Sequence, residues 1–359
     1  MITRRQFGAL VGATTLAIPH IARAAEPVSM RMGSAAGIVD PQLSFATVGM
    51  HKKLGYYEAE GVSLDVLNMS SSSQSLQAVA TGAVEFATIT PLTYLPVLVQ
   101  NPKLNLVCMY EWCPQPYWEV AVKPDSPIQK LQELKGKKVG IRNTGDTGYF
   151  GAKAMLLELG IDPESEVEWI SVGTGGPAGD ALHRGRVDAL AIWDGEFARV
   201  EIAGFKLRYL PVTPSTAKVF GASYGANPAM VAKNRQNYVG LFRGMAKSTV
   251  FAAANPDLAI KLHWELYPES KPKGVDETKA LEETRTILTR RAPKWFRRAD
   301  AADQRVGTSD LAEWQASVAY THTEGKVPDA AKLFSNELIE DVNKFDHAAI
   351  AAQAKAMSL

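Results

Sequence analysis

Cysteine is scarce in this chain of 359 residues, which contains only Cys108 and Cys113. Both lie in the stretch VCMYEWC, and in an extended strand their odd spacing would place them on opposite faces. We therefore expect two free or buried thiols, although an exported location would permit a disulfide.

Histidine is also rare, and its positions do not suggest a metal site. Beyond residue 24 the histidines are His51, His183, His263, His322 and His347, and none has a second histidine at metal-ligand spacing. The motifs H-E-x-x-H and G-x-S-x-G do not occur. We predict no metal, no cofactor and no catalytic residue.

The chain has no long apolar run and no excess of one charge. Its formal net charge is +1, and removal of residues 1–24 would change it to −2, which argues against a nucleic-acid partner. The apolar run from Gly8 to about Ile18 is too short to cross a bilayer. No later segment is long and apolar enough to do so.

The N-terminus instead has the order of an export signal. The pair Arg4–Arg5 precedes the apolar run, and residues 22–24 read A-R-A, which fits a cleavage site. The dipeptide Q-F after the arginines favours a twin-arginine signal over an ordinary secretory one. We predict a signal peptide at 1–24 and a soluble, monomeric periplasmic protein.

The main positive feature is an internal repeat. Residues 61–91 and 165–195 each read as a strand, a loop of small polar residues, a short helix, a glycine turn and a second strand. Another strand, loop and helix precede each copy. Alternating strands and helices predict two α/β lobes with mainly parallel sheets, whose strand-end loops line a ligand crevice. From residue 236 onward the pattern is mostly helical.

A glycine-rich loop lies between a predicted strand and helix in the stretch 137–161. It lacks the lysine and hydroxyl that a P-loop requires. A helix N-terminus can still capture a carboxylate, sulfonate or phosphate, and the glycines would let backbone N–H groups approach it. Arg142, Thr144 and Thr147 would contribute a guanidinium and hydroxyls, with Asp146 as the N-cap. The alternative for Arg142 is a surface ion pair.

A second loop, GTGGPA at 173–178, fits a variant of the dinucleotide-binding fingerprint. It follows a predicted strand, and Asp194 stands near the place of a ribose-binding acid. The predicted helix after the loop is short, and the first copy of the repeat lacks the fingerprint. An exported NAD(P)-dependent oxidoreductase is therefore the alternative of another class.

Several side chains near the strand ends have more than one interpretation. Aromatic residues gather there, and we expect about half of them to face a cleft suited to a flat organic ligand. Asp194 and Glu196 could meet an amine or a ring N–H, or they could cap the following helix. The basic run RRAPKWFRR at 290–298 could meet an anionic partner, but a solvated helix end is favoured.

Four segments follow the predicted signal in a characteristic order: LGYYEAEGVSLDV, LQAVATGAVEFATI, LQELKGKKVGI and ALHRGRVDALAIW. Together they resemble the periplasmic substrate-binding proteins of ABC importers for sulfonates, nitrate and thiamine-precursor pyrimidines, over about residues 30–228. The resemblance implies a type II binding-protein fold, in which two α/β lobes joined by a two-strand hinge close on one small solute. It also implies docking onto an inner-membrane ABC permease that works with a cytoplasmic ATPase. Pyrimidine synthases of the superfamily carry a cysteine-rich iron-binding motif, which this chain lacks.

These observations predict lobe 1 at 25–120 and 225–300, lobe 2 at 121–224, and C-terminal helices at 301–359 that pack on the lobes. The predicted function is capture of a small carboxylate or sulfonate, which can be aromatic, and its delivery to the permease without catalysis. A pyrimidine-like thiamine precursor is the alternative ligand. The predicted ligand-binding residues are Ser34, Ala35, Gly37, Ser71, Ser72, Gln74, Thr88, Thr90, Trp112, Tyr117, Arg142, Thr144, Thr147, Gly175, Trp193, Asp194 and Tyr224.

Overall fold

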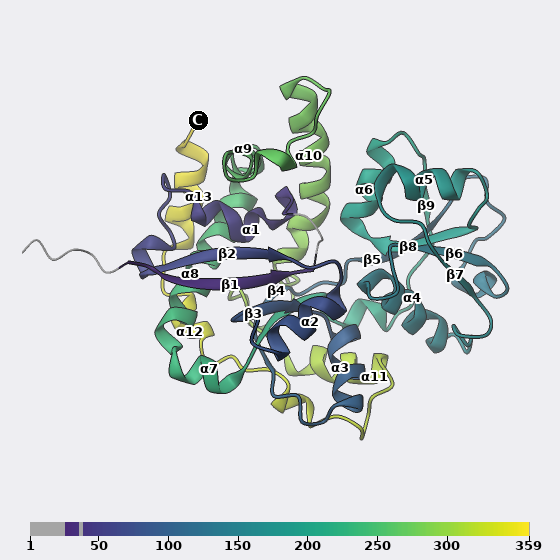
Figure 1. Ribbon diagram of the computed structural model, residues 1–359, viewed down its shortest axis with the longest axis horizontal. Helices are drawn as coiled ribbons and strands as arrows, with labels where there is room; N and C mark the ends of the chain where they lie inside the picture. Colours follow the sequence, from purple (N-terminus) through teal and green to yellow (C-terminus); the bar gives the residue numbers. More distant parts are fainter. Residues whose placement is uncertain (1–25, 36–38, 359) are drawn as a thin grey trace, which may run out of the picture.

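The computed structural model describes residues 26–35 and 39–358, which form two α/β lobes placed side by side (Figure 1). Each lobe contains one five-stranded sheet with helices on both faces. The expected two-lobed α/β fold is therefore confirmed. The predicted signal peptide and Gly37 lie outside the described residues.

Each sheet contains one strand that runs against the others. The first sheet has the order β2-β1-β3-β10-β4, with β1 (Val28–Ser34), β2 (Val62–Asn68), β3 (Phe86–Ile89), β4 (Val107–Cys113) and β10 (Ala222–Ala226). The second has the order β7-β6-β8-β5-β9, with β5 (Trp118–Val122), β6 (Lys138–Ile141), β7 (Glu168–Ser171), β8 (Ala189–Trp193) and β9 (Arg208–Tyr209). The strand β10 is antiparallel to both of its neighbours, and so is β5.

The two orders are equivalent, which confirms the repeat predicted from the sequence. In the first lobe α2 (Ser72–Ala80) connects β2 to β3, and in the second α5 (Gly175–His183) connects β7 to β8. The helix after β6 is α4 (Thr147–Glu158). Its counterpart after β1 is broken into η1 (Pro41–Leu43), α1 (Ser44–Thr47) and η2 (Val48–Met50).

The chain crosses between the lobes twice, first from β4 to β5 and later from β9 to β10. In both cases the first strand after the crossing is the reversed strand of the sheet it joins. The strand β5 begins before the predicted boundary at 121, and β10 begins before the one at 225. The second sheet is thus made from one continuous segment, whereas the first is made from two.

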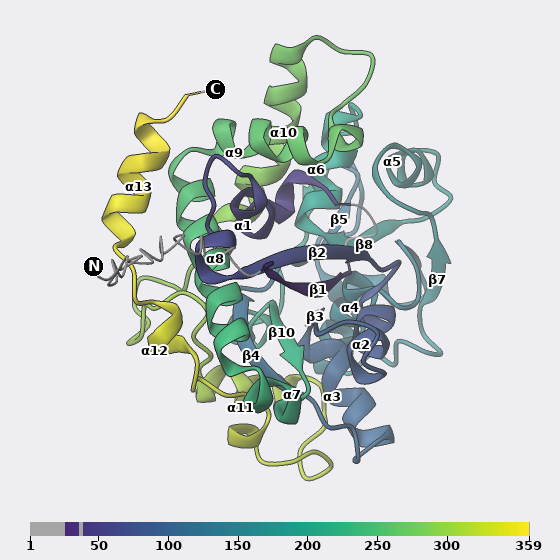
Figure 2. The same ribbon diagram turned by 60° about the vertical axis from the view of Figure 1, so that its left-hand side comes forward.

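Helices cover both faces of each sheet (Figures 1 and 2). One face of the first sheet packs on α1, α8 (Arg235–Ala254), α9 (Pro256–Leu266) and α10 (Glu277–Arg291), and the other on α2, α3 (Pro91–Gln100) and α11 (Leu311–Tyr320). In the second sheet α5 and α6 (Asp194–Ile202) cover one face and α4 the other. The strand β8 alternates accordingly, with Ala189 and Ala191 toward α4 and Leu190 and Ile192 toward α5 and α6.

The remaining helices are short or lie at the edges of the lobes. They are α7 (Pro228–Lys233), α12 (Ile339–Val342) and α13 (His347–Ala356), and all three contact α8. Single 3-10 turns occur at η3 (Glu58–Glu60), η4 (Leu131–Leu134), η5 (Thr216–Lys218), η6 (Pro268–Ser270), η7 (Ala292–Trp295) and η8 (Ala330–Lys332). Among the helices that the structure describes, none is both long and apolar enough to cross a membrane.

The two cysteines lie on β4, and both are buried free thiols. Cys108 belongs to the core beneath α2 and α3, whereas Cys113 belongs to the core beneath α1 and α8. The sequence prediction of free or buried thiols on opposite faces is therefore confirmed.

Candidate functional site

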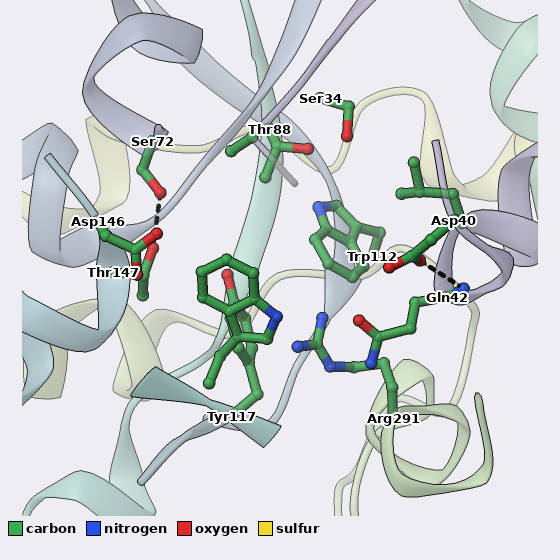
Figure 3. A pocket seen from close by; sticks show the side chains of 13 residues that line it. Ser34, Asp40, Gln42, Ser72, Thr88, Trp112, Tyr117, Asp146, Thr147 and Arg291 are labelled. Atoms are coloured by element: carbon green, nitrogen blue, oxygen red, sulfur yellow. Dashed lines mark hydrogen bonds between the residues drawn. The ribbon is translucent and has the colours of Figure 1, made fainter. Parts of the chain in front are cut away.

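A cavity of about 50 Å³ lies between the lobes, where strand ends of both sheets meet (Figure 3). One buried water needs on the order of 10–15 Å³ of such space, so the cavity holds only a few water-sized groups. Residues from both lobes line it, and they are Ser34, Ala35, Asp40, Gln42, Leu43, Ser72, Thr88, Trp112, Tyr117, Asp146, Thr147, Trp193 and Arg291.

Direct contacts between the lobes close the cleft around this cavity. The hydroxyl oxygens of Ser72 and Thr147 are 2.6 Å apart, as Figure 3 shows. Elsewhere the guanidinium of Arg199, on α6, donates to the carboxylate of Asp40 over 2.6 Å. The structure therefore represents a closed state.

The starts of two helices place Ser72 and Thr147 opposite each other. The helix α2 begins after Ser71, whose Oγ accepts the N–H of Gln74, and α4 begins after Asp146, whose Oδ1 accepts the N–H of Gly148 at 2.9 Å. Asp146 is thus the N-cap that the sequence predicted. Each cap satisfies a backbone donor that a helix start would otherwise leave free.

Arg291 supplies the cationic group of the cavity lining. It lies at the end of α10 and is 5% exposed, and its Nε donates to Asp194 at 3.0 Å. Burial alone would lower the pKa of Arg291, but the Asp194 carboxylate outweighs this effect and raises it. Lys294 also donates to Asp194, at 2.9 Å, and the two cations keep the pKa of this fully buried acid below its usual value despite burial.

The Arg291 guanidinium also stacks on an aromatic wall. Its central carbon is 3.9 Å from the ring centre of Tyr117 and 5.9 Å from that of Trp112. The hydrogen bonds to Asp194 come from Nε and Nη2 of Arg291, and none of them comes from Nη1. Arg291 is thus oriented by a carboxylate and an aromatic face while it contributes to the cavity wall.

Arg142 does not line the cavity and is not a surface residue. Its side chain is 12% exposed and lies over Trp193, with 4.9 Å between the guanidinium carbon and the ring centre. Its Nη1 lies 3.3 Å from an oxygen of Asp146 and donates to the backbone carbonyl of Ala35 at 3.4 Å. Arg142 therefore links the two lobes next to the cavity.

Two acids near the cavity have a raised pKa because they are buried. Burial raises the pKa of Asp146 to about 6, although Gly148 and Arg142 oppose the shift. Burial likewise raises the pKa of Glu196 to about 7, with Arg199 opposing it. Within the described residues, Oε2 of Glu196 is buried without a hydrogen-bond partner.

The structure brings some of the predicted ligand-binding residues together around the cavity. The predicted residues that line the cavity are Ser34, Ala35, Ser72, Thr88, Trp112, Tyr117, Thr147 and Trp193. The predicted residues that do not line it are Ser71, Gln74, Thr90, Arg142, Thr144, Gly175, Asp194 and Tyr224.

Local structure explains why this second group lies elsewhere. Ser71 caps α2, the hydroxyl of Thr90 pairs with that of Thr93, and Tyr224 stacks in the aromatic core. Gln74 accepts the N–H of Ser70, Gly175 lies against Arg199, Asp194 is buried under Arg291, and Thr144 is exposed.

The interpretation of the basic run 290–298 as a solvated helix end is wrong. Arg290 is paired with Glu119 and Glu201 of the second lobe, and the side chain of Arg297 is 5% exposed. With Arg291 and Lys294 on Asp194, this run ties α10 and η7 to the second lobe. The run itself was the only sequence signal for Arg291, since its location beside the cavity depends on the tertiary fold.

Known proteins share both sequence and fold with this chain. A family model described as NMT1/THI5 like matches residues 42–259. The putative aliphatic sulfonates-binding protein of Escherichia coli strain K12 is 24% identical over 198 residues, which are 55% of this chain and 59% of that protein. The chain thus matches less than two thirds of the length of that relative.

Two solved structures show the same fold. The alkanesulfonate-binding protein SsuA of Xanthomonas axonopodis pv. citri, bound to MOPS, has a TM-score of 0.63 at 16% identity, covering 87% of this chain and 100% of that one. The periplasmic aliphatic sulphonate binding protein SsuA of Escherichia coli has a TM-score of 0.62 at 18% identity, covering 86% and 93%. Because the family model covers more than half of the residues, this chain belongs to the NMT1/THI5-like family, in agreement with the resemblance of its four sequence segments.

Proposed function

We propose that the protein is the solute-binding component of an ABC importer and that it captures a small organic carboxylate or sulfonate between its lobes. The observation that carries this proposal is Arg291, a buried guanidinium in the wall of a cavity that both lobes enclose. Arginine suits carboxylates and sulfonates because its planar fork can donate two hydrogen bonds to two oxygens.

The rest of the lining supports binding without chemistry. The hydroxyls of Ser34, Ser72, Thr88 and Thr147 reach the lining from both lobes and can donate to an oxyanion. Among the described residues that line the cavity there is no histidine, cysteine or lysine, so they offer neither a thiol nucleophile nor an imidazole or amine base. We infer that this lining is the binding site.

Closure of the cleft would be the working step. Rotation of the lobes about the two crossings would open the cavity, and a solute that contacts both lobes would favour the closed state. A permease in the inner membrane would then recognise that state. The proposal also includes delivery to a permease, export by a twin-arginine signal, a periplasmic location and a monomeric form. The family supports the permease and the periplasmic location, and the N-terminal sequence supports the export signal.

A thermal-shift screen with purified protein tests the proposal. Sulfonates, carboxylates, nitrate, pyrimidines and NADH form the panel, and no turnover is expected. A solute at a hundredfold excess over its Kd should stabilise the fold by about 2.7 kcal/mol. Selective stabilisation by pyrimidines would favour the thiamine-precursor alternative, and tight NADH binding would favour the oxidoreductase. Absence of any solute effect would contradict the proposal.

The substitution Arg291→Lys tests whether the Arg291 guanidinium binds the anionic group of the solute. Lysine keeps the charge beside Asp194 but loses the planar fork, so the affinity for the identified anion should fall at least tenfold. Arg184→Lys is the control, because Arg184 forms an exposed ion pair with Asp180 on α5. Unchanged affinity in Arg291→Lys would remove Arg291 from the site.

A further inference from the structure

Three charged side chains line the cavity in the part of the chain that the structure describes, and two of them are acids. Asp40 and Asp146 present carboxylates, which accept hydrogen bonds but donate none when they are ionised, whereas Arg291 only donates. In Figure 3 Asp146 lies on one side of the cavity and Arg291 and Asp40 lie toward the other. A solute that can only accept hydrogen bonds would satisfy Arg291 but would meet the carboxylates with unfavourable charge.

Asp146 is more weakly paired with its counter-ion than Asp40 is, although its Oδ1 accepts the Gly148 N–H at 2.9 Å. The Oδ2 of Asp40 receives Arg199 at 2.6 Å and its Oδ1 receives the Gln42 N–H at 2.8 Å. In contrast, Oδ2 of Asp146 has Arg142 at 3.3 Å, a long contact for a charge-assisted hydrogen bond. This weak pairing agrees with the raised pKa of Asp146, since burial outweighs its partners.

The charges around the cavity are also balanced without a solute. Each lining charge has a counter-ion: Arg199 for Asp40, Arg142 for Asp146 and Asp194 for Arg291. Arg199 also meets the acid Glu196, and Asp194 also meets the cation Lys294, so these two further groups balance each other. A solute with a net charge would therefore leave an uncompensated charge in an enclosed site, which costs free energy. A solute that carries both charges would avoid this cost.

We propose that the solute is a short zwitterion whose carboxylate or sulfonate meets Arg291 and whose ammonium group meets Asp146. This inference rests on the proposed function and narrows its substrate class. The small cavity volume favours a molecule with a chain of only a few atoms between the two groups.

Matched compounds test the inference by isothermal titration calorimetry. One series is β-alanine, propionate and propylamine, and a second compares 2-aminoethanesulfonate with ethanesulfonate. Within each series the zwitterion should bind at least tenfold more tightly than the analogue with one charge. Equal or tighter binding of the simple anions would overturn the inference and leave the proposed function intact. Absence of binding throughout the series and the wider panel would overturn both.

Asp146→Asn provides a switch in specificity. Asparagine is as good an N-cap as aspartate, so α4 should keep its start and the protein should fold. The variant should bind the zwitterion at least tenfold more weakly and the simple anion as well as or better than the parent protein. Asp180→Asn, in an exposed pair on α5, is the control and should change neither affinity. An equal loss of affinity for the zwitterion and for the anion would show that Asp146 does not bind the ammonium group.

Discussion

Glu196 illustrates the cost of an incompletely bonded acid at a lobe interface. Its residue is 4% exposed, and Arg199 Nε lies 3.4 Å from one carboxylate oxygen while the other oxygen has no partner among the described residues. Burial therefore favours the protonated acid, and its pKa rises to about 7. The folded protein holds this proton more tightly than the unfolded chain does.

This difference predicts how stability depends on pH. Stability should fall as the pH rises from about 4.5 toward about 7, because the folded state must give up a proton that it binds strongly. Glu196→Gln should remove this dependence, with little effect at pH 4.5 and a gain of up to about 3 kcal/mol at pH 8. Urea unfolding at both pH values measures it. Glu324→Gln, at an exposed site, serves as the control. An equal change in unfolding free energy at both pH values in Glu196→Gln would contradict the prediction.

At the level of elements, the glycines just before α4 and in its first turns allow segments to pack closely. A Cβ on Gly148 would lie 2.7 Å from the backbone Cα of Ile192 in β8. A Cβ on Gly151 would lie 2.3 Å from the ring of Trp118, and one on Gly145 would meet Ser71 of the other lobe at 2.8 Å. From the sequence, these glycines are expected to let a ligand approach the backbone. In the structure they instead let α4 approach β8, Trp118 and the opposite lobe closely.

Two matched glycines test this role. Gly148 and Gly176 both occupy the second position of a helix, but a Cβ on Gly176 would meet only Ala203, at 3.8 Å. Gly148→Ala should destabilise the protein by about 1–3 kcal/mol, because β8 backbone cannot give way easily. Gly176→Ala should be neutral or stabilising by up to about 1 kcal/mol. Chemical unfolding compares them, and equal effects would contradict the packing argument.

Local sequence patterns predicted the elements well and part of the cavity lining. The repeat and its strand-end loops placed Ser34, Ser72, Thr88, Thr147 and Trp193 correctly in the cavity wall, because parallel strands end at the same edge of a sheet. Arg291 could not be located in this way. It lies on a helix and is 97 residues beyond its partner Asp194, and the same basic run would fit a solvated helix end.

For the whole molecule, the closed cleft is a state that can be locked. Ser72 and Thr147 belong to different lobes, and their hydroxyl oxygens are 2.6 Å apart. Because the two hydroxyl oxygens are in contact, the sulfur atoms of cysteines at these positions should come within bonding reach. A small adjustment should then give the geometry of a disulfide, whose Cβ atoms lie about 3.8 Å apart. The native thiols are buried on β4 and should not interfere.

The locked protein gives a test of the closure step. If solute enters by lobe opening, oxidised Ser72→Cys/Thr147→Cys protein should exchange solute at least a hundredfold more slowly than the reduced form. Stopped-flow fluorescence of the lining tryptophans follows the exchange. The single variant Ser72→Cys controls for loss of the hydroxyl, and equal exchange rates in both redox states would show that the lobes need not separate.

The reversed strand of the first sheet also dictates an order of events during synthesis. The strand β10 lies between β3 and β4, yet it is made only after the whole second lobe. The second sheet can form from one uninterrupted segment. Until β10 is made, the backbone groups of β3 and β4 that will pair with it stay unpaired, and unpaired strand edges are prone to aggregation. Folding of the first lobe is therefore the late step, and a nascent chain that stops before β10 would present two unpaired strand edges to its surroundings.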